Sequence, residues 1–167
     1  GEYLAKWGVA TDKVNELDWW QSVDFDGVKF IATPAQHFSG RGLSGRNKTL
    51  WASWVITTAT HNIFYSGDGG YFDGFKKIGA ALGPFNLAIL ESGAYDEKWP
   101  SVHMMPEQTI QAHKDLNAKV LLPVHNSTFD LAFHPWYDPL AKLSVLALEQ
   151  DIKLATPIIG ERYLLDG

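Results

Sequence analysis

Three side chains that could bind a metal ion each follow an apolar segment of this chain. His37 follows VKFIATPAQ, Asp68 follows NIFYSG, and His125 follows AKVLLPV. An imidazole or a carboxylate at the end of a buried strand loses hydration, which costs free energy unless a partner group compensates. A metal ion satisfies both kinds of group at once. The sequence therefore predicts that these three residues contribute to a shared metal site.

A simpler explanation exists for each of the three residues taken alone. An Asp followed by glycines, as in YSGDGGY around Asp68, is ordinary turn chemistry. The joint occurrence of three such strand endings favours the metal interpretation. Glu91 also ends an apolar segment, and we expect it to make backbone hydrogen bonds at the edge of a cleft.

Further polar residues are candidates for contact with a substrate. His103, in SVHMMPEQ, precedes a predicted helix; it either assists proton transfer at the substrate or bonds to the backbone at the helix start. His134, in AFHPWYDP, is a candidate for substrate binding, although local packing is the more common role for a histidine with aromatic neighbours. Arg41 and Arg46, in FSGRGLSGR, could pair with a phosphate through their guanidinium groups or lie in a solvated loop. We expect His113 to be at the surface or half-buried.

These residues must be positioned by alternating strands and helices, which the apolar patterns predict along most of the chain. Helical spacing of Phe72, Phe75, Ile78 and Leu82 predicts a helix that ends at Gly83-Pro84. The predicted strands are 28–32, 50–58, 62–65, 85–91, 120–124 and 153–165, and the predicted helices are 71–82, 106–116 and 139–150.

The order of these elements predicts an α/β (α+β) fold. The first half is a β-meander and the second half alternates strand and helix, which indicates a mixed sheet with helices on one face. Segments such as NLAIL and VLLPV are apolar on both sides. The second face of the sheet therefore needs a partner layer, which is either missing from this chain or supplied by another copy.

Composition limits the classes of function. The chain has 167 residues, 46% hydrophobic, and a net charge of -5, which argues against nucleic-acid binding. It contains no cysteine, so disulfides, thiolate metal sites and a cysteine nucleophile are excluded. Without an apolar run of membrane-spanning length or a secretory-signal pattern at its start, we expect a cytoplasmic location.

Several motifs resemble those of one family when they are taken in order along the chain. TPAQHFSGR, YSGDGGY and LPVHNSTF, together with LDWW, LWASW and GPFNLAILESGAY, resemble the metallo-β-lactamase-fold zinc hydrolases. The branch that they resemble contains the phospholipase D that hydrolyses N-acylphosphatidylethanolamine. The resemblance extends to about His134. It implies an αββα sandwich, of which residues 1–167 form a single partial domain, the C-terminal half.

The resemblance also implies roles for individual residues in a two-zinc site. His37 would bind one zinc, His125 the other, and Asp68 would bridge them, while His103 would lie at the substrate. Two metal ions about 3.5–4 Å apart hold a phosphoryl group and lower the pKa of a bound water toward neutrality. The His-x-His-x-Asp-His loop of the family does not occur in this sequence. Because catalytic zinc sites usually have three protein ligands, we expect this chain alone to bind zinc weakly or not at all and to be inactive.

Two classes of function remain in view. The first is a zinc-dependent hydrolase that attacks a small-molecule or lipid phosphodiester with metal-bound hydroxide, whose parent protein would associate peripherally with a membrane. Similar scaffolds also open lactones and cleave other phosphoesters. The second is a non-catalytic half-domain that self-associates, as a homo-oligomer, through its uncovered sheet face.

Overall fold

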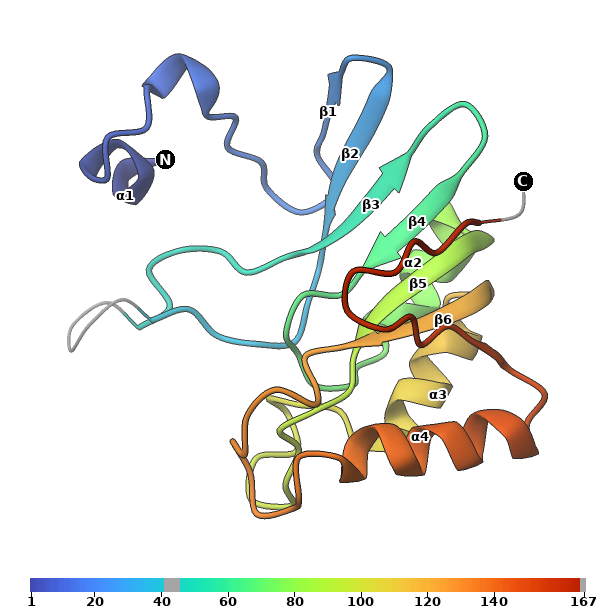
Figure 1. Cartoon of the computed structure of the whole chain (residues 1–167). Helices are drawn as coiled ribbons and strands as arrows, with labels where there is room; N and C mark the ends of the chain where they lie inside the picture. The colour runs from blue at the N-terminus through green and yellow to red at the C-terminus, as the bar shows by residue number, and fades with distance from the viewer. Residues whose placement is uncertain (41–45, 166–167) are drawn as a thin grey trace.

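A computed structural model describes residues 1–40 and 46–165 of the chain. Its centre is a seven-stranded sheet whose strands lie in the order of the sequence, from β1 to β7 (Figure 1). The strands are β1 (Ser22–Phe25), β2 (Val28–Thr33), β3 (Ser53–Thr57), β4 (Asn62–Tyr65), β5 (Phe85–Glu91), β6 (Ala118–Val124) and β7 (Lys153–Leu154).

The direction of the strands changes halfway across the sheet. Strands β1 to β4 pair antiparallel with their neighbours, whereas β4 to β7 pair parallel. Parallel neighbours need a crossover connection, and a helix supplies each one. These helices are α2 (Gly74–Leu82), α3 (Pro106–Asp115) and α4 (Asp138–Glu149). The predicted mixed sheet with helices on one face is therefore confirmed.

The main core lies between the sheet and these three helices. One row of side chains crosses the sheet through the paired residues Val55, Phe64, Ala88 and Leu121. All four are buried in a single cluster with residues of the helices. Burial of one such side chain contributes about 1.5–3 kcal/mol, so this cluster fixes the strands on which the candidate site residues depend. The helical members of the cluster are Phe75, Ile78, Ile110, Ala112, Leu143 and Ala147.

The opposite face of the sheet is partly covered by the end of the chain itself. Figure 1 shows the segment after β7 running back across the sheet in front of β5 and β6. Its residues Ala155 and Tyr163 pack in a second cluster with Leu87 and Val120. The predicted strand 153–165 is therefore wrong beyond Leu154: after a last backbone hydrogen bond from the Ala155 N–H to the Leu121 carbonyl oxygen, the segment leaves the edge of the sheet. Tyr163 and Leu165 then pack on the face of the sheet, whereas Ile158 and Ile159 are exposed.

The part of this face formed by the first strands is not covered in the same way. An apolar groove runs over β1 to β4, lined by Val23, Phe30, Trp54, Ile56 and Tyr65. The Tyr65 side chain is 40% exposed. If a further layer packs on this face, as the sequence predicts, it would cover the antiparallel strands β1 to β4.

Some elements differ from the sequence prediction. Helix α1 (Glu2–Lys6), the 3-10 helix η1 (Thr11–Lys13) and strand β1 are additional, and Figure 1 shows α1 lying apart from the sheet. Helix α2 begins at Gly74, three residues later than predicted. Tyr71 and Phe72 fit the helical spacing because both pack against the core just before the helix starts.

Candidate metal-binding active site

The candidate residues lie at one edge of the sheet because of the strand directions. Strands β4, β5 and β6 are parallel, and β2 has the same direction as β4, since two antiparallel pairings separate them. His37 follows β2, Asp68 follows β4, Glu91 ends β5 and His125 follows β6. All four therefore lie at or beyond the carboxyl ends of strands, where α/β sheets commonly bind ligands.

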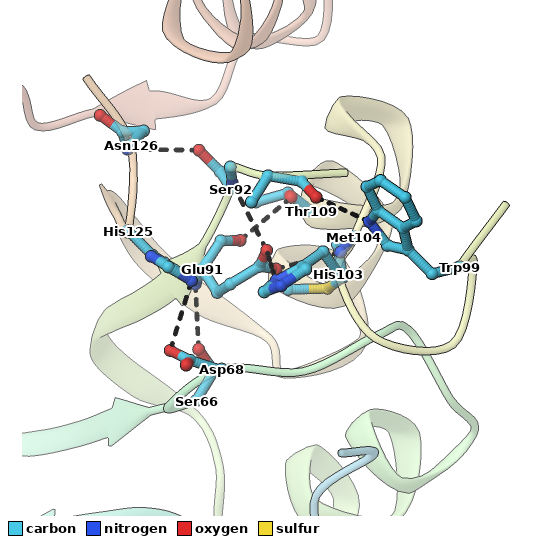
Figure 2. A network of polar contacts seen from close by, with 12 residues as sticks. Ser66, Asp68, Glu91, Ser92, Trp99, His103, Met104, Thr109, His125 and Asn126 are labelled. Carbon is cyan, nitrogen blue, oxygen red and sulfur yellow. Dashed lines mark hydrogen bonds and ion pairs between the residues drawn. The ribbon is translucent and has the colours of Figure 1, made fainter. Parts of the chain in front are cut away.

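Asp68 and His125 approach each other directly (Figure 2). Oδ1 of Asp68 lies 3.8 Å from Nε2 of His125, and the two side chains are 54% and 29% exposed. The distance is too long for a hydrogen bond, and both groups can be reached from solvent. His125 has a φ of 60°, a left-handed conformation that is costly for a residue with a side chain. Gly67 supplies the matching turn before Asp68, with a φ of 64°.

His103 lies between the two other histidines of this edge. The centre of its ring is 5.1 Å from that of His125 and 6.0 Å from that of His37. His37 stacks on Phe38 at 4.6 Å, and its Nδ1 lies 2.9 Å from the carbonyl oxygen of Phe38. The structure thus brings the three histidines and Asp68 to one place. Among these four side chains, only Asp68 and His125 bring possible ligand atoms close to each other, at 3.8 Å.

The donors fit part of a metal site. Imidazole nitrogen and carboxylate oxygen are ordinary zinc ligands at about 2.0–2.2 Å, and donors 3.8 Å apart can reach one ion. Among the residues that the structure describes, however, no group of three or more His, Asp or Glu side chains is close enough to hold a metal. Within the described ranges, Asp68 and His125 therefore form a pair of ligands, fewer than the three of a usual catalytic zinc site.

Glu91 has a role that the sequence did not reveal. Its side chain is fully buried, at 0% exposure. Nδ1 of His103 lies 3.0 Å from its Oε1, and the backbone N–H of Met104 donates to its Oε2 at 3.0 Å (Figure 2). Burial raises the pKa of Glu91, and the hydrogen bonds from His103 and Met104 oppose that rise. The available signal was a single acidic residue ending an otherwise apolar buried strand, FNLAILE.

A cleft of about 340 Å³ opens beside His125. His134 lines it and stacks on Tyr95, with ring centres 4.3 Å apart. Behind them, the Tyr95 hydroxyl donates to Oδ2 of Asp138 at 2.5 Å. The other side chains of the cleft are mainly apolar or hydroxyl-bearing: Ser127, Thr128, Phe129, Leu131, Trp136 and Pro139.

The remaining candidates are placed less centrally or differently from expectation. The guanidinium carbon of Arg46 lies 5.4 Å from the centre of the Phe38 ring, next to His37, and Arg41 is outside the described residues. His113 was expected at the surface or half-buried, which is wrong, because it is only 4% exposed. Burial lowers the pKa of His113 to about 4, assisted by the charge of Lys114.

Residues 1–126 match the family described as the beta-lactamase superfamily domain, and the chain belongs to this superfamily. An uncharacterised protein of Mycobacterium tuberculosis is 45% identical over 165 residues, which is 97% of this chain and 44% of that protein. N-acyl-phosphatidylethanolamine-hydrolyzing phospholipase D 1 of Caenorhabditis elegans is 34% identical, over 90% of this chain and 47% of that protein. The mitochondrial enzyme of the same name from Saccharomyces cerevisiae is 38% identical, over 81% and 31%. The chain spans less than half the length of these relatives.

Solved structures agree on the fold. Igni18, a metallo hydrolase from Ignicoccus hospitalis, superposes with a TM-score of 0.71 at 22% identity, covering 96% of this chain and 63% of that one. CmlA, a diiron beta-hydroxylase from Streptomyces venezuelae, gives 0.67 at 12% identity, covering 92% and 34%. At these identities the likeness concerns the fold alone. Metal use is a property of the family: a UPF0173 metal-dependent hydrolase of Pelotomaculum thermopropionicum is 32% identical, over 80% of this chain and 56% of that protein.

No helix in the described part of the chain combines the length and apolar character needed to cross a bilayer.

Proposed function

We propose that this chain is the C-terminal part of a zinc-dependent phosphodiester hydrolase. The observation that carries the proposal is the 3.8 Å approach of Asp68 to His125 at an edge where His37 and His103 also lie. His37 and His125 would each bind one of two zinc ions, and Asp68 would bridge them. The further ligands would come from a part of the protein outside these 167 residues.

The chain's own residues would orient the substrate and transfer protons. When bound, the zinc ions would polarise the phosphoryl group and lower the pKa of a water molecule. His103, in contact with both histidine ligands, would donate a proton to the substrate or accept one from it at Nε2. Arg46, held beside His37 through Phe38, would supply positive charge to the phosphate.

The cleft beside His125 suggests a substrate with an apolar part. His134 and Trp136 line it, and Phe129 and Leu131 at its wall are 72% and 62% exposed. Exposed apolar side chains next to a reaction site suit a lipid better than a small polar ester. We therefore propose an N-acylated phospholipid, cleaved as in the phospholipase D relatives, by a cytoplasmic protein that binds the membrane peripherally. Lactones and other phosphoesters are the alternatives on the same scaffold.

The test is hydrolysis by the complete, zinc-loaded protein that contains this chain. We expect release of the N-acylethanolamine from N-acylphosphatidylethanolamine vesicles, detected by mass spectrometry, and a loss of at least about 100-fold with His125→Ala. Lactone opening without phosphodiester cleavage would reject the proposed substrate. For the chain alone we expect weak or no zinc binding in calorimetry; sub-micromolar binding of two ions would contradict the proposed division of ligands.

A second candidate function has one specific observation in its favour. The apolar groove over β1 to β4 includes the half-buried Phe30, Trp54 and Ile56, and Asn15 and Leu17 of the segment before β1 line its side. A non-catalytic half-domain would pair this face with a second copy. Light scattering at increasing concentration tests it: a dimer that Phe30→Glu dissociates supports self-association, whereas a monomer at all concentrations rejects it.

A further inference from the structure

The side chain of Glu91 has polar contacts from three directions. Besides Nδ1 of His103 and the N–H of Met104, the backbone N–H of Gly93 points at Oε1 from 3.4 Å. A backbone N–H can only donate, so both carboxylate oxygens already act as acceptors. An ionised carboxylate accepts all three hydrogen bonds, and it then requires the proton of the contact with His103 to lie on Nδ1.

We propose that Glu91 is a positioning residue that fixes the Nδ1–H tautomer of His103 and directs its Nε2 toward the metal-binding edge. The inference rests on the proposed function, in which Nε2 of His103 exchanges a proton with the substrate. Nε2 lies on the side of the imidazole ring opposite Nδ1, and it therefore faces away from the buried carboxylate. The ring contacts His125 and His37 and is 14% exposed.

The surroundings of Glu91 hold the carboxylate in place. Its own N–H donates to Oγ of Ser66 at 3.0 Å, and Oγ1 of Thr109 donates to its carbonyl oxygen at 3.3 Å. Because Glu91 binds both the ring of His103 and the backbone of Met104, one carboxylate fixes the side chain and the loop that carries it. Precise placement of a catalytic group normally depends on such a supporting shell.

The tautomer decides which nitrogen of His103 can accept a proton from the substrate. With Glu91 as acceptor, the neutral ring carries its proton on Nδ1, and Nε2 is then the accepting nitrogen. A histidine bonded only to solvent would populate both tautomers and would present an accepting nitrogen to the substrate in only a fraction of molecules.

The experiment is long-range ¹H–¹⁵N NMR of the histidine rings in this chain, without metal or substrate, at about pH 8, where a typical imidazole is neutral. In the wild-type chain we expect His103 to carry its proton on Nδ1. Glu91→Gln has the same shape but only one accepting oxygen. The Met104 N–H, at 3.0 Å, is a closer donor than the Gly93 N–H, at 3.4 Å, so the amide oxygen should face Met104 and the NH₂ group should face His103. We therefore expect this variant to convert His103 to the Nε2–H tautomer.

Asp115→Asn is the matched control, because Asp115 also accepts hydrogen bonds from side chains, those of Tyr71 and Gln111, at the end of α3. It should leave the His103 tautomer unchanged. An Nε2–H tautomer in the wild-type chain overturns the inference, as does a folded Glu91→Gln variant that keeps Nδ1–H. The wild-type measurement decides even if Glu91→Gln does not fold.

The result is independent of whether the complete protein hydrolyses a phosphodiester. An Nδ1–H tautomer combined with no hydrolysis by the complete protein would reject the proposed function alone, and hydrolysis combined with the wrong tautomer would reject this inference alone. In an active complete protein, Glu91→Gln should lower kcat at least about 10-fold with little change in KM. The same change in a His103→Ala background should have no further effect, because Glu91 acts through His103.

Discussion

A Cβ atom on Gly93 would lie 2.0 Å from the carbonyl oxygen of His125. No side chain fits at that separation. Position 93, just after β5, must therefore be a glycine so that the backbone after β6 can pass beside it. The backbone of His125 thus takes its place from the residue two positions after Glu91. The ends of β5 and β6 therefore contact each other through the backbone atoms of Gly93 and His125, in addition to the side-chain contacts of the candidate site.

Gly93→Ala should therefore displace His125 and destabilise the fold. We expect a loss of about 1–3 kcal/mol in the free energy of unfolding, the usual cost of overpacking, measured by urea denaturation. Gly40→Ala is the control, because no atom of the residues that the structure describes lies within 4 Å of its Cβ position; its effect should stay within about 0.5 kcal/mol. Equal stability of the two variants would show that the His125 backbone moves without cost.

The left-handed backbone of His125 leads to a second prediction. Both His125→Gly and His125→Ala remove the imidazole, but only glycine adopts a φ of 60° without strain. We expect the Gly variant to be more stable than the Ala variant by about 1 kcal/mol in urea denaturation. If Ala proves the more stable replacement, the backbone of His125 carries no strain. The predicted result would mean that the residue is retained for its side chain at the expense of stability.

Asp68 should matter for metal binding and hardly for folding, because its side chain is 54% exposed. In the complete protein, Asp68→Asn should reduce zinc content, measured by elemental analysis, from two ions toward one or none. Its thermal midpoint in the metal-free state should not change. Asp73→Asn, at a side chain that is 82% exposed beside α2, is the matched control and should leave the zinc content unaltered. Full zinc occupancy in Asp68→Asn would remove Asp68 from the ligand set.

The buried His113 predicts a pH dependence of stability. Its pKa is about 4 in the folded chain, against about 6.5 in the unfolded chain. Below pH 6.5 the unfolded state therefore binds more protons, and stability falls as the pH decreases from 6.5 toward 4. The total loss is on the order of 3 kcal/mol, with a maximum slope of about 1.4 kcal/mol per pH unit.

Urea denaturation of the wild type and of His113→Gln at several pH values measures this contribution. The variant removes the titrating group, so the difference in stability between the two proteins should be constant above about pH 7 and shift in favour of the variant below it. Parallel curves down to pH 4 would show that His113 does not titrate differently in the two states.

The sequence predicted the buried strands well and the surface elements poorly. Strands β4 and β5 have the predicted bounds because continuous apolar runs between turn residues have few alternatives. Strand β1, with the sequence SVDF, was missed because it is short and contains a charge. The segment 155–165 was misassigned because its apolar residues do not form a strand: Ala155, Tyr163 and Leu165 pack on a face of the sheet, whereas Ile158, Ile159 and Leu164 are exposed.

For the candidate site, position in sequence was most informative for residues at strand ends. His37, Asp68 and His125 could be grouped because strands of the same direction end at the same edge. The contact between Glu91 and His103 could not be predicted, because it depends on how the loop before α3 folds back onto β5. The burial of His113 likewise follows from packing that local patterns do not encode.

The order of the strands has a consequence for how the protein matures. Strand β5 separates β4 from β6, so the pairing of Asp68 with His125 requires two parallel ladders and the two helical crossovers between them to be complete. Such non-local pairings form slowly compared with hairpins such as β3–β4. In the proposed metal site, an ion could therefore bind between these donors only after β4, β5 and β6 and the crossovers α2 and α3 have assembled, so metal uptake would come late in folding.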